Sequence, residues 1–428
     1  MSTSVRSSTS PSTPIPGTPE PTSESPGIGG ALRDYGVRLR GGDVGGLPAI
    51  LGLLVLVAVF SGLRPSTFTN AFNFANLIHQ SAAVIVIAMG LVFILLLGEI
   101  DLAAGYTAGT AAAVMGIVVT QQGQPWWLAV LACLAAGAVV GALIGLLVAR
   151  LGIPSFVVTL AAFLGLQGVL LKLIGEGGTI AIRDSTLIAI NNDDLPLAVG
   201  WILAIGTVVV YAVISLRGAA VRRAGGLHTA PPAVLIGKIV VVAVLLLAAT
   251  AYLSVERSRN PAATSLKGVP IVVAVLLVLY VTLNFVLSRT SFGRHVYAVG
   301  GNAEAARRAG INVRQVRLAC FVIGATLAAV AGILLASRNN SISPTTGGAD
   351  TLLYAVGAAV IGGTSLFGGK GRVIDAVLGG LVIAVIINGM GLLNQPSSVV
   401  YMVTGIVLLV AASVDAISRR RAQSTGRI

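Results

Sequence analysis

The chain has 428 residues, of which 55% are hydrophobic and 10% are charged, and its mean hydropathy is +0.93. A polypeptide this apolar cannot cover itself with a polar surface in water, so the composition predicts an integral membrane protein with the lipid bilayer as its solvent. The net charge of +13 would suit nucleic acid, but aromatic residues make up only 5% of the chain and no basic stretch alternates with stacking rings. We expect no nucleic-acid binding, and assign the basic residues to cytoplasmic loops.

The cysteines and histidines give no sign of a metal site or a disulfide framework. Cys133 and Cys320 each lie inside an apolar run, where cysteine packs as a small hydrophobic residue. His79, His228 and His295 are far apart, and none belongs to a ligand-spaced motif such as HExxH. We therefore expect no metal ion and no cofactor.

The N-terminal segment differs sharply from the rest of the chain. Residues 1–46 are rich in Ser, Thr, Pro and Gly without helical or strand periodicity, which predicts a disordered cytoplasmic tail. A cleavable signal peptide is not expected, because the first apolar run starts only at Leu47. Residues 47–418 are predicted as one transmembrane domain and residues 419–428 as a basic cytoplasmic tail.

Beyond the tail, apolar runs of about 16 to 25 residues recur between short polar breaks, which suits helices that cross a hydrocarbon core about 30 Å thick. The pattern predicts an all-α polytopic membrane protein with about twelve transmembrane helices, and any number from about ten to twelve fits it. The sequence shows no internal repeat. The expected limits are 47–63, 75–97, 102–120, 126–149, 154–174, 195–215, 233–253, 269–288, 317–337, 352–367, 374–394 and 398–416.

The distribution of positive charge predicts the orientation. With the N-terminal tail placed in the cytoplasm, 21 of the 28 Lys and Arg residues lie in inner segments and seven in outer ones. This split predicts an even number of spans with both termini inside. The outer segment GEGGTIAIRDSTLIAINNDDLP, after the span 154–174, is either a solvated loop or a contact for an extracytoplasmic partner.

Three glycines at four-residue steps, Gly137, Gly141 and Gly145, lie on one face of the span 126–149. Small residues in this pattern leave a smooth ridge that another helix backbone can approach closely. We expect these glycines to serve packing.

The longest cytoplasmic loop, 289–317, contains a short predicted helix with both ends marked. It has a capping residue, an acidic residue in the first turn, basic residues in the last turn and a terminating glycine, at Asn302, Glu304, Arg307, Arg308 and Gly310. So short a helix is not stable alone in water. It rests either on the protein's own membrane face or in a groove of another protein.

The stretch Glu304, Ala305, Ala306, followed after three residues by Gly310, resembles the E-A-A-x3-G signature of bacterial ATP-binding cassette (ABC) importer permeases. The surrounding sequence resembles the ribose and xylose branch of that family. The similar segments are GRHVYAVGGNAEAARRAGINVRQVRLACFVIGATLAAVAGIL, VIGGTSLFGGKGR and INGMGLL in the second half, and GEIDLAAG and IPSFVVTLAAFLGLQGVLL in the first.

The pair of spans between about 195 and 253 makes the chain longer than ribose-type members and resembles xylose-type members. Two positions depart from the family pattern: Ala103 replaces Ser after IDL, and Thr404 replaces a Lys of xylose-type members in the last span. Both departures leave the identity of the sugar open.

The resemblance implies the permease subunit of an importer for a monosaccharide such as xylose, in the bacterial cytoplasmic membrane. It also implies a separate ATPase subunit, an extracytoplasmic sugar-binding protein and a second copy of the chain in a homodimer. The segment implied to fit a groove of the ATPase comprises Asn302, Glu304, Ala305, Ala306, Arg307, Arg308 and Gly310.

The run GGTSLFGGKGR invites comparison with a phosphate-binding loop, which needs Gly six residues before its Lys and Ser or Thr after it. Thr364 and Gly371 occupy those positions around Lys370. We therefore expect no ATP site and no enzymatic activity in this chain. The run is predicted to form a tight inner turn, or a second contact with the ATPase.

Two acidic residues, Glu99 and Asp101, lie at the junction of the spans 75–97 and 102–120. An unpaired charge at the bilayer centre costs about 2.5 to 3.5 kcal/mol, so these residues should face an aqueous cavity or a partner. They are candidates for the substrate path. The alternative for Asp101 is the N-cap of the next helix.

Thr159, Phe163 and Gln167 share one face of the span 154–174 and combine an aromatic ring with hydrogen-bonding groups, as a sugar path would. Asn388 is a further candidate, in the span 374–394. Helix packing is the alternative for all four.

Two other classes fit the composition. An ion-coupled secondary sugar transporter predicts ionisable residues in mid-span, and these are nearly absent. A membrane-anchored sensor or scaffold predicts a soluble domain, and the sequence has none to anchor.

Overall fold

The computed structural model describes residues 45–424 except 227–230, 259 and 262–264. Most of the predicted N-terminal tail, His228 and the last four residues lie outside this part of the chain. The helices are α2 (Leu47–Leu63), α3 (Pro65–Phe68), α4 (Ala71–Leu96), α5 (Ala104–Gly116), the π-helix η1 (Ile117–Gln121), α6 (Trp126–Ala149), α7 (Ser155–Ile174), α8 (Ser185–Asn192), α9 (Leu197–Ala224), α10 (Pro232–Leu253), α11 (Ile271–Arg289), α12 (Ser291–Gly301), α13 (Ala303–Arg308), α14 (Val313–Asn339), α15 (Ala349–Gly362), α16 (Val373–Leu392) and α17 (Ser397–Ser424).

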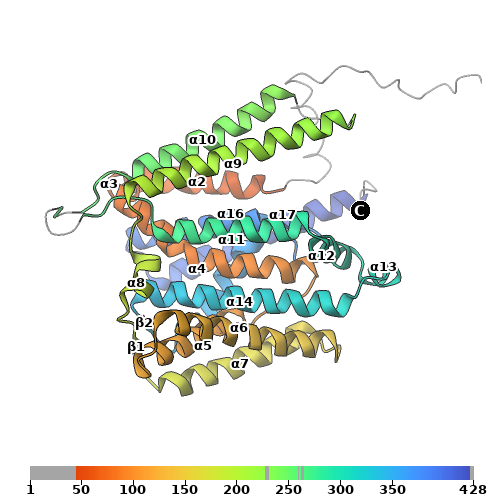
Figure 1. Cartoon of the computed structure of the whole chain (residues 1–428), viewed down its shortest axis with the longest axis horizontal. Helices are drawn as coiled ribbons and strands as arrows, with labels where there is room; N and C mark the ends of the chain where they lie inside the picture. The colour runs from red at the N-terminus through yellow and green to blue at the C-terminus, as the bar shows by residue number, and fades with distance from the viewer. Residues whose placement is uncertain (1–44, 227–230, 259, 262–264, 425–428) are drawn as a thin grey trace, which may run out of the picture.

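The structure confirms an all-α polytopic membrane fold, because each of the twelve predicted runs coincides with helix. Within the described residues, eight helices are long and apolar enough to cross a bilayer, and three more apolar helices are shorter. The remaining run, 102–120, forms α5 and η1. Most of these helices lie nearly side by side (Figure 1), with α12 and α13 at one end, the α13 end, and with α3, α8, β1 and β2 at the other, the α8 end.

Several short elements of the connections were not predicted. The outer segment after α7, expected as a loop, contains β1 (Ile180–Ala181) and α8. β1 pairs antiparallel with β2 (Ser341–Ile342), with Ile180 opposite Ile342. Asp184 caps α8 by accepting a hydrogen bond from the Leu187 amide at 3.0 Å, a local signal that was available in the sequence.

Further hydrogen bonds fasten this segment to the end of α14. The Asn191 side chain donates a hydrogen bond to the carbonyl of Leu334 at 3.2 Å, and the backbone amide of Asn191 donates one to the Ser337 hydroxyl at 2.9 Å. At the same end, Arg257 forms an ion pair with Asp194 that is almost fully buried. The α8 end is therefore built on the core.

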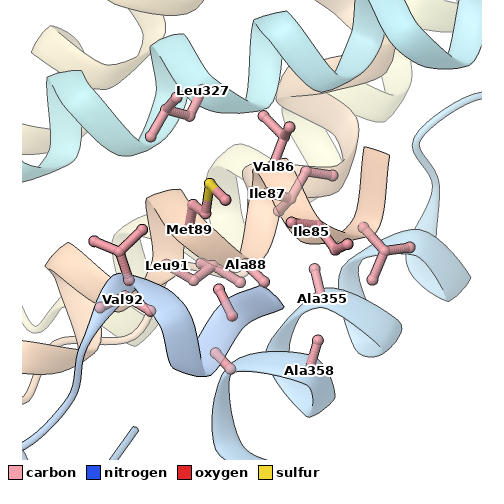
Figure 2. Close-up of a cluster of buried hydrophobic side chains, with 14 of the residues drawn as sticks. Ile85, Val86, Ile87, Ala88, Met89, Leu91, Val92, Leu327, Ala355 and Ala358 are labelled. Carbon is pink, nitrogen blue, oxygen red and sulfur yellow. The ribbon is translucent and has the colours of Figure 1, made fainter. Parts of the chain in front are cut away.

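The core centres on α4, whose residues from Ser81 to Leu96 are all buried. Its side chains are apolar on every side, as expected for a helix surrounded by protein. Figure 2 shows Ile85 to Val92 of α4 between Leu327 of α14 and Ala355 and Ala358 of α15. By contrast, α9 and α10 keep most of their apolar side chains exposed at the edge of the bundle, as expected for helices that face lipid (Figure 1).

The predicted glycine ridge is confirmed as a packing surface of α6 against α14. A Cβ added at Gly137, Gly141 or Gly145 would lie 2.6, 2.6 and 2.8 Å from atoms of Ala329, Phe321 and Leu318, respectively. Only glycine permits this approach of the two backbones.

Two halves of the chain share one pattern of contacts. In the first half, α4 to α7, α5 packs on α6 and α7, and in the second half, α14 to α17, α15 packs on α16 and α17. Between the halves, α4 packs on α15 and α16, and α14 packs on α5 and α6. Because α4 ends near the α13 end and α14 begins there, the two halves have opposite orientations. The structure thus contains an inverted repeat that the sequence does not reveal.

Each half has a non-helical interruption, residues 97–103 between α4 and α5 and residues 340–348 between α14 and α15. The second interruption packs on α5, the helix that follows the first interruption: a Cβ on Gly105 of α5 would overlap the carbonyl oxygen of Gly347, and one on Gly109 would overlap that of Thr346. Irregular backbone at membrane depth is tolerated only where protein covers it or a water-filled cavity adjoins it.

Candidate functional site

The loop between α11 and α14 forms α13 with the predicted ends. The Asn302 side chain accepts a hydrogen bond from the Ala305 amide at 2.9 Å, and Gly310 has a φ of +84°. Glu304 pairs with Arg307 at 2.9 Å and with Arg308 at 3.3 Å. The predicted cap, charges and terminating glycine are thus confirmed as local structure.

α13 presents nearly all of its side chains to the outside. Among its residues only Ala306 is buried, at 5% exposure, while Glu304, Ala305, Arg307 and Arg308 are exposed. A cleft of about 530 Å³ adjoins it, lined by residues of α12 and of the start of α14, including Phe292, His295 and Val316. The exposed side chains of α13 and this cleft are thus both accessible from outside the described part of the chain.

A second short helix, α12, links α13 to the core and was not predicted. Thr290 caps it by accepting a hydrogen bond from the Gly293 amide at 3.2 Å. The Tyr297 hydroxyl donates to the carbonyl of Gly371 at 2.8 Å, and burial raises the pKa of this phenol, so it remains a donor. α12 thereby fastens α13 to the turn before α16.

That segment, residues 363–372, forms the predicted tight turn between two helices, and its place on the inner side stays a prediction. Gly363, Gly368 and Gly369 have φ values of +116°, +86° and +74°, and the Gly369 amide donates to the carbonyl of Leu96 at 2.8 Å. A helix, α15, precedes the turn, whereas a phosphate-binding loop follows a strand. The turn joins the end of α4 to α12.

Glu99 has a partner, as the cost of an unpaired charge predicts. Its carboxylate lies 3.0 Å from the guanidinium of Arg317, near the start of α14, and the two side chains are 13% and 30% exposed. The pair joins the first helix interruption to the helix that directly follows α13. The sequence could not reveal this pairing, because 218 residues separate the two.

The Glu99–Arg317 ion pair is expected to contribute about 1 kcal/mol to the free energy of unfolding, since it is partly buried. A double-mutant cycle of Glu99→Gln and Arg317→Gln, measured by thermal melting in detergent, should show this coupling. The exposed Glu304→Gln serves as the control and should lower stability by less than about 0.5 kcal/mol. Additive effects of the two single substitutions would contradict the pair.

Asp101 lies near the start of α5 but is not its N-cap, so that expectation is wrong in position. The N-cap residue is Ala103. The carboxylate of Asp101, which is buried, accepts a hydrogen bond of 2.8 Å from the backbone amide of Ala103. Two residues, Leu102 and Ala103, therefore separate Asp101 from the first residue of α5. Thr159 is also buried and donates to the carbonyl of Ser155 at 2.8 Å.

The other path candidates lie in two separate places. Asn388 is buried and exchanges two hydrogen bonds of 2.9 Å with Asn73 of α4, so it joins two helices. Phe163 packs edge-on against Tyr106 with ring centroids 4.7 Å apart, and Gln167 is partly exposed one turn further along α7. A role of these residues in a sugar path stays a prediction.

Three polar residues that the sequence did not single out lie at the start of α15 and beside it. The Tyr401 hydroxyl donates to the Asp350 carboxylate at 2.7 Å, and Tyr106 lies close to Gly348, the N-cap of α15. The available signal was an acidic residue two positions before the predicted span 352–367. Within the described residues, no group of three His, Cys, Asp or Glu side chains is placed to hold a metal ion.

Comparison with known proteins identifies relatives that align with most of the chain. Residues 73–412 match the family described as branched-chain amino acid transport system, permease component. The xylose transport system permease protein XylH of Escherichia coli K12 is 34% identical, over 87% of this chain and 92% of that protein. The corresponding protein of Haemophilus influenzae is 33% identical, over 87% and 96%.

The ribose import permease protein RbsC of Escherichia coli K12 is 30% identical, over 86% of this chain and 92% of that protein. No solved structure matches the chain. The family match and these relatives confirm the resemblance drawn from the short motifs. The chain belongs to the family of ABC importer permeases, as a relative of the xylose and ribose permeases.

Proposed function

We propose that the chain is the membrane-spanning permease of an ABC importer for a monosaccharide, with xylose as the first candidate. The observation that carries the proposal is the 34% identity to a xylose permease over 87% of the chain. The family description names branched-chain amino acids, whereas the three relatives described above are named for xylose or ribose. We give the relatives more weight because they cover most of both chains.

The proposal assigns α13 as the docking element for a separate ATPase subunit, with Asn302, Glu304, Ala305, Ala306, Arg307, Arg308 and Gly310 as the coupling residues. Support comes from the exposure of α13 and from its attachments. Closure of the ATPase would push α13 and, through α12 and the turn 363–372, the end of α4. The Glu99–Arg317 pair offers a second route to the first interruption.

The proposal places the α13 end and both termini in the bacterial cytoplasm, and the α8 end outside. An extracytoplasmic binding protein would deliver sugar at the α8 end, and two copies of the chain would form a homodimer over two ATPases. The excess of basic residues in the segments assigned to the inside supports this orientation. Alternating access would then move sugar inward with weak contacts along the path.

Coexpression with an ABC ATPase and a sugar-binding protein, to be sought among the genes beside its own, tests the proposal. The purified chain should copurify with the ATPase, and the reconstituted complex should hydrolyse ATP faster when the binding protein and D-xylose are added. The chain purified alone should neither bind nor hydrolyse ATP. Xylose uptake by the lone chain in proteoliposomes without ATP would overturn the proposal and favour ion-coupled transport.

A further inference from the structure

A cavity of about 450 Å³, the α8-end cavity, lies at the end of the bundle opposite α13 (Figure 1). Four segments that are far apart in sequence line it: the start of α4, the connection after α8, the connection between α10 and α11, and the end of α14. Pockets for small molecules have volumes of about 300 to 1,000 Å³, so this one suits a small ligand. Its polar lining includes Asn76, His79, Asn192, Asp194, Arg257 and Arg338.

One wall of the α8-end cavity carries a fixed ion pair. Arg257 donates hydrogen bonds to the backbone carbonyls of Leu253 and Gly268 at 3.2 and 3.1 Å. Its guanidinium also pairs with the Asp194 carboxylate, so the two charges cancel. The Oδ1 atom of Asp194 is buried and accepts no hydrogen bond from the residues that the structure describes. Buried carboxylate oxygens rarely stay without a donor, so Asp194 is suited to accept one from a ligand in the cavity that it lines.

A second wall supplies hydrogen-bond donors. Arg338, near the end of α14, donates from Nη2 to the Asn76 side chain of α4 at 3.2 Å, its only hydrogen bond among the described residues. A guanidinium has five N–H donors, so others remain for a ligand. His79 contacts the Asn191 side chain through Nδ1 at 3.3 Å, which leaves Nε2 as the ring nitrogen for the cavity. This wall therefore offers donors where the first offers an acceptor.

An aromatic ring lies at the rim of the cavity. Phe72, at the start of α4, belongs to the lining and is 56% exposed, and Leu266 adds further apolar surface. A phenyl ring at the end of a span would also suit the membrane interface. Because this ring adjoins a polar cavity, it also gives the cavity an apolar patch beside charged and amide groups. Ligand pockets combine the two kinds of surface in this way.

Fastening of the α8 end to the core is the alternative role of these polar residues. It accounts for the bonds of Arg257 and of Asn191, which are directed at backbone carbonyls of neighbouring segments. It does not account for the donors that Arg338 leaves unused, nor for the volume between the fastened segments. Side chains that only join segments would close the space between them, as protein interiors are close-packed.

The mixture of groups selects a class of ligand. An anion would bond to Arg338 but could not donate a hydrogen bond to Asp194. A cation would be repelled by Arg338, whose charge no carboxylate of the described residues pairs with. A neutral polyol satisfies both walls, because each hydroxyl group both donates and accepts hydrogen bonds. The ring of Phe72 suits the apolar face of a sugar ring.

We propose that the α8-end cavity binds a neutral monosaccharide, with Asp194 as acceptor, Arg338 as donor and Phe72 against the apolar face of the sugar ring. The proposal rests on the proposed function and names a binding position within it, because that function places the arrival of sugar at the α8 end. The cavity holds the sugar after its release from the binding protein and before its passage between the helices.

Thiol labelling of the purified chain tests binding without the other subunits. In a chain with Cys133→Ala and Cys320→Ala, Asn339→Cys places a thiol at the exposed edge of the cavity. D-xylose or D-ribose at twice its Kd should slow the reaction with a water-soluble maleimide about threefold, because only the unliganded fraction reacts. Gln122→Cys, exposed after η1 and outside the lining, is the matched control, and sugar should not change its rate.

Two substitutions should weaken this protection. Arg338→Gln should raise the sugar concentration needed for half-protection about tenfold or more, since hydrogen bonds to charged groups contribute on this scale. Phe72→Ala, which removes an exposed ring, should raise it as well. Arg183→Gln, exposed in the outer segment and outside the lining, should leave it unchanged. In the complete complex, Arg338→Gln should lower D-xylose uptake while the amount of copurified ATPase stays at the wild-type level.

The outcomes separate the cavity from the function. Labelling that neither sugar slows, in a chain whose complex imports one of them, would overturn the sugar site and leave the transport function standing. Protection by inorganic phosphate and by neither sugar would also overturn it, since the ligand would be an anion. Equal protection of Arg338→Gln and the wild type would overturn the site as assigned. Protection by sugar in a chain whose complex imports no sugar would overturn the proposed function and keep the site.

Discussion

Ala305→Asp is expected to lower sugar-dependent ATP hydrolysis and sugar uptake by about 30-fold or more. Ala305 is exposed on α13, and a carboxylate buried without a partner in a docking groove costs about 2 kcal/mol or more. α13 itself should persist, because an acidic residue near a helix N-terminus is favourable. The loss would therefore report docking and not unfolding of the helix.

The measurements are copurification of the ATPase and sugar-stimulated ATP hydrolysis by the reconstituted complex. Ala220→Asp is the matched control, because it places the same charge at an exposed position near the end of α9, away from α13. The control should behave as wild type. Undiminished copurification of the ATPase with Ala305→Asp would show that α13 is not the docking element.

Gly141→Val should prevent the chain from reaching its folded state. A Cβ at Gly141 would lie 2.6 Å from the carbonyl oxygen of Phe321 and 2.8 Å from the Cα of Val322, so α6 would have to move away from α14. Because backbone atoms cannot move aside as a flexible side chain does, we expect a loss of about 3 kcal/mol or more.

Size-exclusion chromatography and thermal melting of the purified chain measure this loss. Gly206→Val is the control in α9, since a Cβ there would meet no atom within 4 Å. The control should elute as a single peak with nearly the wild-type melting temperature. A normal elution profile for Gly141→Val would mean that α6 and α14 do not pack as described.

The spans were predictable because a chain in lipid must satisfy its backbone polar groups locally, so each crossing becomes a long apolar helix. The run 126–149 coincides with α6 for this reason. The glycine ridge was predictable from one helix alone. α13 was predictable because its signals, from Asn302 to Gly310, lie within nine residues.

The unpredicted features depend on residues far apart in sequence. The partner of Glu99 is Arg317, and the partner of Asn388 is Asn73; neither follows from local spacing. Asp350 lies in a predicted outer connection, and its partner Tyr401 is 51 residues away in the last helix. The inverted repeat is likewise a property of contacts, because the two halves pack alike without sharing a visible sequence pattern.

The contact between α5 and the second helix interruption has a mechanical consequence. Gly105 and Gly109 pack directly on the backbone of Thr346 and Gly347, and close-packed backbone transmits displacement with little give. A shift of the start of α5, which directly follows residues 97–103, would therefore displace residues 340–348. In the proposed transport cycle, opening on one side of the membrane and closing on the other would then be a single movement.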